Sequence, residues 1–151
     1  MKIFLITGVS GAGKTVFVKA LEDIGYYCVD NLPVPLLNNF FDLLKKEKKY
    51  DKIAVVIDIR EKFFIVESNS ILKNIQKKIS NIKIIFLEAR DEILLRRFSE
   101  TRRKHPLNSF DILSSIDEER KILKIFKEKA DYIIDTSTFS NYDLRKQAEL
   151  I

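Results

Sequence analysis

One segment near the amino end has the residue types and the spacing of a site for a polyphosphate. It matches the pattern G-x-x-x-x-G-K-[ST], known as a P-loop or Walker A motif. Its residues are Gly8, Val9, Ser10, Gly11, Ala12, Gly13, Lys14 and Thr15. Because glycine has no side chain, successive backbone N–H groups can turn inward around phosphate oxygens, and a following helix adds its positive end. Three of the four glycines in the chain lie in this segment, which argues against an incidental turn.

The last two residues of the segment supply the remaining chemistry. We expect Lys14, a candidate catalytic residue, to provide a mobile cation for the β and γ phosphates. The hydroxyl of Thr15 is a hard oxygen ligand suited to Mg²⁺, which would bridge the same phosphates. The motif therefore predicts ATP or GTP, together with Mg²⁺, as the cofactors.

Acidic residues follow two of the predicted strands. Asp58 directly follows the apolar run Ile53 to Ile57, in the form of a Walker B segment. Its carboxylate is a candidate catalytic residue and metal ligand, which would orient Mg²⁺ directly or through water. Asp30 follows another strand, and it could act as a base toward a substrate hydroxyl or simply cap a turn. For Asp30, the residues alone leave both interpretations open.

A basic run lies in the second half of the chain, between Glu88 and Lys104. Such a run can act as a lid whose guanidinium groups neutralise charge on phosphates, and Arg102 and Arg103 are our candidates for that catalytic role. The alternative is a solvated helix face on which arginines pair with acids such as Glu92 and Glu100.

The elements that must position these groups follow an alternating pattern. Short apolar runs recur between stretches with helical spacing, as in a parallel sheet covered on both faces. The predicted strands are Lys2 to Ile6, Tyr26 to Val29, Ile53 to Ile57, Lys83 to Leu87 and Tyr132 to Ile134. We therefore expect the α/β class: a three-layer, nucleoside-kinase-like P-loop NTPase fold with a five-stranded, mostly parallel sheet.

Helix faces and helix ends can also be predicted. Apolar residues at helical intervals indicate two core faces, one formed by Leu36, Leu37, Phe40, Phe41 and Leu44, and another by Ile71, Leu72, Ile75 and Ile79. Gly25 is expected to end the first helix, and Asp91 to begin the fourth. Ser115 and Glu118 have the spacing of a capping box at the start of a later helix.

Composition predicts the class of protein. The chain has 151 residues, of which 46% are hydrophobic and 32% charged, so we expect residues 1–151 to form one P-loop nucleotide-binding domain in the cytoplasm, with no membrane association. The single cysteine, Cys28, excludes an internal disulfide and is expected to be a buried structural thiol. The net charge of +5 suits nucleotides or RNA, although lysines on helix surfaces would give the same balance.

Taken together, the motifs resemble the RapZ family, also called the YvcJ or RNase-adapter family. The stretches that match its pattern are TGVSGAGKT (7–15), ALEDIGYYCVDNLP (20–33), DIR (58–60), RRFSETRRKHPL (96–107) and ADYIIDTS (130–137). The resemblance implies binding of ATP and GTP with weak hydrolysis. It also implies a guanine-nucleotide contact at Asp58, Ile59, Arg60 and Glu61, although Asp58 is equally readable as the Walker B acid.

The resemblance also implies partners. Some members of the family bind a small regulatory RNA and present it to an RNase, and the RNA is bound by a second, C-terminal domain that this chain lacks. A homo-oligomer is also compatible with the family. Our leading hypothesis is a regulatory module that binds a nucleoside triphosphate. The alternatives are a small-molecule kinase in which Asp30 assists an acceptor hydroxyl, and a module that only binds RNA.

Overall fold

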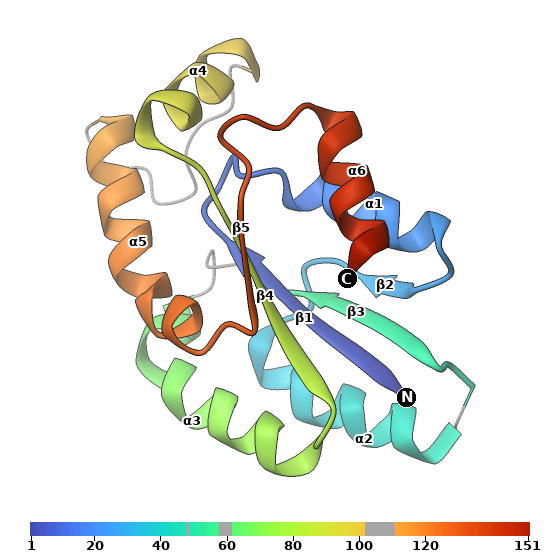
Figure 1. Ribbon diagram of the computed structural model, residues 1–151. Helices are drawn as coiled ribbons and strands as arrows, with labels where there is room; N and C mark the ends of the chain where they lie inside the picture. Colours follow the sequence, from blue (N-terminus) through green and yellow to red (C-terminus); the bar gives the residue numbers. More distant parts are fainter. Residues whose placement is uncertain (48, 58–61, 102–110) are drawn as a thin grey trace.

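The computed structural model describes residues 1–47, 49–57, 62–101 and 111–151, in which strands and helices alternate (Figure 1). The strands are β1 (Lys2–Gly8), β2 (Tyr27–Val29), β3 (Lys52–Val56), β4 (Ile82–Glu88) and β5 (Tyr132–Asp135). The helices are α1 (Lys14–Asp23), α2 (Leu37–Glu47), α3 (Lys62–Lys78), α4 (Asp91–Thr101), α5 (Ile112–Glu128) and α6 (Asn141–Leu150), with a 3-10 turn at Val34–Leu36. Each predicted strand is confirmed, and its ends differ from the prediction by two residues at most.

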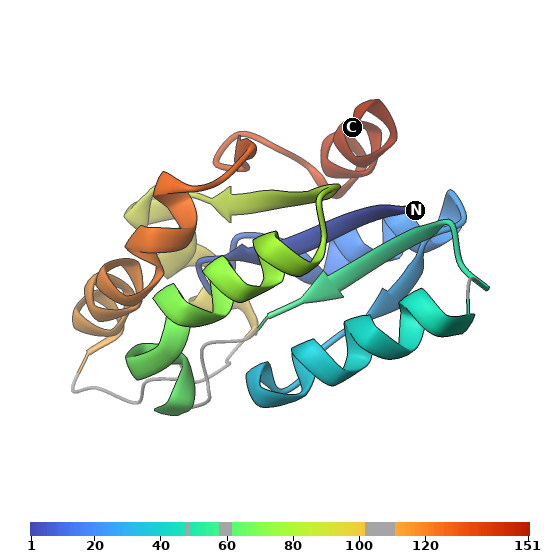
Figure 2. The same ribbon diagram turned by 90° about the horizontal axis from the view of Figure 1, so that it is seen from below.

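The five strands form one sheet in the order β2-β3-β1-β4-β5, and all four pairings are parallel. Figure 2 shows α2, α3 and α5 on one face of the sheet and α1 and α6 on the other. Because both faces are covered, β1 is buried from Ile3 to Gly8. The predicted three-layer α/β fold is confirmed, and parallel pairing brings the carboxyl ends of all five strands to one edge of the sheet.

The predicted helix faces are largely confirmed. Leu37, Phe41 and Leu44 of α2 are buried, as are Leu72 and Ile75 of α3 and Ile79 just after that helix. Leu36 differs from the prediction because it lies in the 3-10 turn before α2 and is 48% exposed. None of the helices in the described part of the chain combines the length and the apolar run that a membrane span requires.

The predicted helix ends are partly correct. Gly25 follows α1 with a φ of 89°, and α4 begins at Asp91, as expected. The predicted capping box at Ser115 is wrong, because Asp111 caps α5 and Ser115 is buried in its first turns. The Asp111 carboxylate accepts the N–H of Ser114, and this cap starts the helix one turn earlier. The structure instead has a capping box at the start of α6, between Ser140 and Asp143.

The cysteine lies at the edge of the core. Cys28 is half-buried, packs against the core and donates its S–H to the carbonyl of Val18 at 3.7 Å. Burial, with smaller contributions from Glu22 and Asp30, raises the pKa of the Cys28 thiol to about 12. A thiol that stays protonated at neutral pH is a poor nucleophile, which supports a structural role.

Candidate functional site

The candidate site is built on the loop between β1 and α1. Gly8 ends β1 with a φ of 145°, and a Cβ at this position would lie 2.1 Å from the carbonyl oxygen of Leu87 on β4. Gly13, which caps α1 with a φ of 99°, would place a Cβ 2.7 Å from the side chain of Leu144. Gly8 is therefore required by close packing against backbone as well as by its backbone conformation, whereas at Gly13 the positive φ is the main requirement, because the Leu144 side chain can shift.

The loop presents the start of α1 to a ligand. The first N–H groups of a helix have no intrahelical acceptor, and Gly13 at the N-cap has no side chain to satisfy them. The helix dipole adds a partial positive charge at the same end. Together, these groups can bind the oxygens of an anion such as phosphate.

The side chain of Lys14 folds back onto the start of the P-loop. The ammonium of Lys14 donates hydrogen bonds to the carbonyl oxygens of Gly8 at 2.6 Å and of Val9 at 3.1 Å. Lys14 and Thr15 both line the cavity described below, and Thr15 is exposed. The two side chains that the sequence predicts as the cation and the metal ligand therefore line the same cavity.

Four contacts from distant elements hold the loop in shape. The N–H of Val9 donates to the carbonyl of Leu87 at 3.0 Å, which ties the loop to β4. The other three contacts involve Ser10, Gly11 and Ala12, which are bonded by Glu119 of α5, Arg97 of α4 and Thr136 after β5, respectively. The loop is thus organised by protein contacts, which lowers the cost of ordering it around a ligand.

Arg97 bridges two parts of the site. One of its terminal nitrogens donates to the carbonyl of Gly11 at 2.9 Å and to the hydroxyl of Thr136 at 3.0 Å, and the other donates to the carbonyl of Thr136 at 2.8 Å. Burial, and then the neighbouring Arg96, lower the pKa of the Arg97 guanidinium. It nevertheless stays charged at neutral pH, because an arginine is not deprotonated in proteins.

A cavity of about 730 Å³ opens beside the loop, within the usual size range of small-molecule sites. Its walls come from the P-loop, the turn after β2, α4, and the segment from the end of β5 into α6. They include Lys14, Thr15, Asp30, Asn31, Arg97, Phe98, Thr136, Phe139, Ser140 and Leu144. A nucleotide fits this arrangement, because its phosphates can lie on the loop while polar and aromatic groups surround the rest of the cavity.

The residues near the loop suit a metal ion that is bound jointly with phosphates. Among residues 1–47, 49–57, 62–101 and 111–151, no group of three or more His, Cys, Asp and Glu side chains could hold a metal by itself. Mg²⁺ in nucleotide sites takes one or two protein oxygens and completes its shell with phosphates and water. The hydroxyl of Thr15 on the cavity wall is such an oxygen.

Several predicted site residues cannot be placed. Asp58, Ile59, Arg60 and Glu61 lie outside the described residues, as do Arg102 and Arg103, so their roles stay predictions. Within the predicted basic run, Arg96 pairs with Glu100 at 3.8 Å on the exposed face of α4. This pair matches the solvated-face alternative, whereas Arg97 on the same helix turns toward the P-loop.

Glu119 and Thr136 were not among the residues selected from the sequence. A signal existed for Glu119, because it occupies the apolar stripe of α5 together with Ile116, Leu123 and Phe126, all of them buried. An acid at a core position of an amphipathic helix indicates a specific partner. The identity of that partner requires the tertiary structure.

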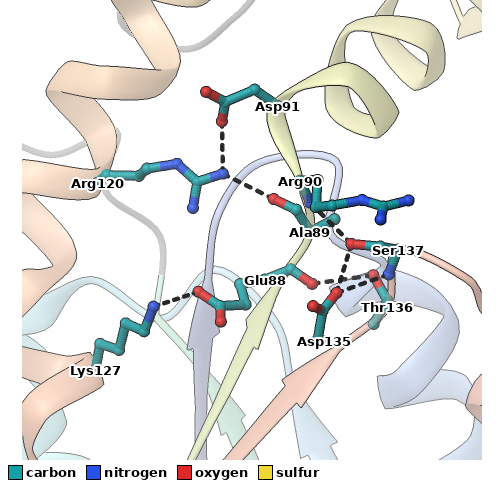
Figure 3. Close-up of polar contacts among 9 residues, drawn as sticks. All are labelled: Glu88, Ala89, Arg90, Asp91, Arg120, Lys127, Asp135, Thr136 and Ser137. Atoms are coloured by element: carbon teal, nitrogen blue, oxygen red, sulfur yellow. Dashed lines mark hydrogen bonds and ion pairs between the residues drawn. The ribbon is translucent and has the colours of Figure 1, made fainter.

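Beside the P-loop, a network of charged groups joins α5 to the ends of β4 and β5 (Figure 3). Arg120 donates to the carbonyl of Ala89 and to the carboxylate of Asp91, both at 2.7 Å, and Lys127 pairs with Glu88 at 2.6 Å. The side chain of Ser137 accepts the N–H of Arg90 at 2.9 Å, which links the ends of β4 and β5. These bonds hold α4 and α5 in place around the site.

Comparison with known proteins agrees with this architecture. The chain is 46% identical over 151 residues to a nucleotide-binding protein of Syntrophomonas wolfei and 45% identical over 153 residues to one of Clostridium perfringens, covering 99% and 100% of this chain. The chain spans about half the length of these relatives, 51% and 52% respectively.

Solved structures show the same fold at low identity. YorR of Bacillus subtilis, solved in complex with phosphorylated GDP, superposes with a TM-score of 0.67 at 16% identity, covering 99% of this chain and 94% of YorR. Shikimate kinase of Bacteroides thetaiotaomicron superposes with a TM-score of 0.61 at 15% identity, covering 99% and 95% of the two chains. The family model of the RapZ-like N-terminal domain matches residues 1–150. The chain therefore belongs to the RapZ-like N-terminal domain family.

Proposed function

We propose that this domain binds ATP or GTP with Mg²⁺ in the cavity beside the P-loop and acts as a nucleotide-sensing regulatory module of a longer protein. The main supporting observation is the loop of residues 8–15, whose shape is maintained by protein contacts and which lines a cavity of about 730 Å³. The names of the relatives, which are nucleotide-binding proteins, support the same ligand class.

In this proposal each residue of the site has a separate task. The amides at the start of α1 bind the phosphate oxygens, and Lys14 neutralises the β and γ phosphates. The hydroxyl of Thr15 ligates Mg²⁺, with Asp58 orienting the ion directly or through water. Arg102 and Arg103 are proposed to close over the phosphates, and Asp58 to Glu61 to provide the guanine-nucleotide contact. The roles of Asp58 at the metal ion, of Arg102 and Arg103, and of Asp58 to Glu61 at the guanine nucleotide rest on the sequence.

The regulatory part of the proposal concerns the longer protein. The curated relatives are about twice as long as this chain, and the family resemblance suggests that the remaining half binds a small regulatory RNA and an RNase. Weak hydrolysis fits such a module. When hydrolysis is slow, the fraction of the domain that has nucleotide bound follows the cellular concentration of that nucleotide. The basic charge of this domain, +5, would add a salt-sensitive attraction to RNA without sequence specificity.

A kinase is the second candidate, favoured by the residues after β2. Asp30 and Asn31 line the same cavity as Lys14, so an acceptor hydroxyl bound there could meet a γ phosphate held on the loop. The similarity to the fold of a shikimate kinase is compatible with this reaction. Under this hypothesis, Asp30 would accept the proton of the acceptor hydroxyl.

Calorimetry with non-hydrolysable ATP and GTP analogues, with and without Mg²⁺, tests the nucleotide proposal. We expect binding that strengthens with Mg²⁺ and that weakens about 100-fold or more in Lys14→Ala, because a charged hydrogen-bonding group at the phosphates is lost. Lys19→Ala is the matched control, since Lys19 is exposed on the same helix, and its affinity should equal that of the wild type. Equal affinity in Lys14→Ala and Lys19→Ala would contradict the proposal.

A second assay separates the regulatory module from the kinase. The protein is incubated with ATP and a panel of small metabolites that carry hydroxyl groups, and both free phosphate and phosphorylated products are measured. Slow release of free phosphate alone supports the regulatory module. Stoichiometric transfer of phosphate to one metabolite, lost in Asp30→Asn, would establish the kinase instead.

A further inference from the structure

A fully buried carboxylate contacts the P-loop. Glu119 on α5 is 0% exposed, and its Oε1 accepts two hydrogen bonds from one residue of the loop. The N–H of Ser10 donates at 2.8 Å and the hydroxyl of Ser10 at 2.7 Å. An acid beside a loop suited to an anion is unexpected, because like charges at short range oppose binding. Its presence calls for a role that outweighs this repulsion.

The backbone and the side chain of Ser10 are tied to the same oxygen. Two bonds to one acceptor fix both the position of the Ser10 amide and the rotamer of its side chain. Ser10 lies two residues after Gly8, where the chain leaves β1 and begins to turn. The Glu119 contact therefore sets the path of the loop between the end of β1 and the start of α1.

The helix that presents Glu119 is itself fixed in place. The next residue, Arg120, binds the carbonyl of Ala89 and the carboxylate of Asp91 at the start of α4, and Lys127 binds Glu88 at the end of β4 (Figure 3). The carbonyl of Leu87 on β4 accepts the N–H of Val9. The P-loop and the helix that carries Glu119 are thus both hydrogen-bonded to the end of β4. This shared attachment makes the Glu119 carboxylate a rigid support for the loop.

We propose that Glu119 is a positioning residue of the nucleotide site, acting through Ser10 to hold the P-loop in its phosphate-binding shape. This inference rests on the proposed function. Glu119 contacts the loop and is not among the residues that line the cavity. The gain in affinity comes from preorganisation, because a loop that is already ordered loses less conformational freedom when the phosphates bind. Hydrogen-bond acceptance by Glu119, and not its negative charge, is the property that the loop requires.

Two substitutions separate acceptance from charge. Both hydrogen bonds from Ser10 end on one oxygen, so the amide oxygen of Glu119→Gln can accept them. The side chain of Glu119→Met has a similar length but accepts neither bond. We expect Glu119→Met to weaken ATP-analogue binding about 10-fold or more and Glu119→Gln to stay within about 3-fold of the wild type. Glu118→Met is the matched control, because Glu118 is exposed on the same helix and its loss changes the net charge equally.

A double-mutant cycle isolates the contact with Ser10 from any other contact of Glu119. Ser10→Ala, Glu119→Met and the double variant are compared by calorimetry, and thermal unfolding without nucleotide checks that each variant is folded. We expect Ser10→Ala to weaken binding, and the double variant to bind no more weakly than Glu119→Met. If the loss of binding free energy in the double variant equals the sum of the losses in Ser10→Ala and Glu119→Met, the proposal is overturned. Equal affinity in Glu119→Met and Glu118→Met would overturn it as well.

The result remains interpretable if Glu119→Met does not fold. In that case Ser10→Ala, compared with the wild type and with Glu119→Gln, still reports on the contact, and unchanged affinity in Ser10→Ala counts against the proposal. The two proposals also fail in different ways. A wild type that binds no nucleotide contradicts the proposed function. A wild type that binds, with Lys14→Ala impaired and Glu119→Met unaffected, contradicts only the role of Glu119.

Discussion

The hydroxyl of Thr136 donates a hydrogen bond to the carbonyl of Ala12 at 2.8 Å, which joins the end of β5 to the P-loop across 124 positions of the chain. The same hydroxyl accepts a bond from Arg97. Because Thr136 is 1% exposed, its hydroxyl cannot exchange these partners for water. One buried side chain thus holds the second half of the P-loop while Glu119 holds the first.

Replacing this hydroxyl should weaken both the fold and the site. Thr136→Val keeps the shape of the side chain but leaves the carbonyl of Ala12 and one nitrogen of Arg97 without this partner, and we expect a loss of about 1–3 kcal/mol in the free energy of unfolding. Chemical denaturation measures this change. The exposed residue Thr138 offers a control, and Thr138→Val should leave the free energy of unfolding within about 0.5 kcal/mol of the wild type.

The planar fork of Arg97 should matter beyond its charge. Arg97→Lys keeps one positive charge, but a single ammonium cannot reproduce the bonds to Gly11 and to both oxygens of Thr136. We expect nucleotide affinity to fall about 10-fold, measured by calorimetry. Arg96→Lys changes a neighbouring arginine whose side chain is 63% exposed, and it should have no effect. An equal loss in both variants would indicate that net charge alone matters.

Two glycines with positive φ should differ in their tolerance of alanine. At Gly8 a Cβ would lie 2.1 Å from the backbone oxygen of Leu87, so we expect Gly8→Ala to lower the free energy of unfolding by about 3 kcal/mol or more. At Gly25 the φ is 89° but no atom lies within 4 Å of such a Cβ, so only conformational strain of about 1 kcal/mol should remain. Denaturation of the two variants checks the difference, and similar losses would contradict the described packing of Gly8.

The carboxylate at the end of β5 should show a pH-dependent contribution. The Ser137 side chain, and then its backbone N–H, hold the pKa of Asp135 below its ordinary value of 3.8. A lowered pKa means that the folded state favours the charged form, so the contribution to stability is present above about pH 4 and is lost as the pH falls through the folded pKa. In Ser137→Ala we expect an NMR titration to show a higher pKa for Asp135. An unchanged pKa would show that Ser137 is not the cause.

Much of the fold is encoded locally. The central strands β1, β3 and β4 are largely apolar because helices cover both faces of the sheet there, and the P-loop is a contiguous motif, so each can be identified within a short window of sequence. The predicted start of α5 was wrong because Asp111 and Ser115 are both residue types that can cap a helix. Which of them is the N-cap depends on which turn of the helix is buried, and Ser115 is buried.

The amino-acid sequence by itself determined the position of the P-loop motif and the strands of the sheet, and it predicts that Lys14 and Thr15 serve one site. Only the tertiary structure decided what supports that loop, because Glu119, Arg97 and Thr136 bond residues that are 109, 86 and 124 positions away. Contacts over such separations depend on how the helices pack against a common sheet. No local pattern specifies that packing.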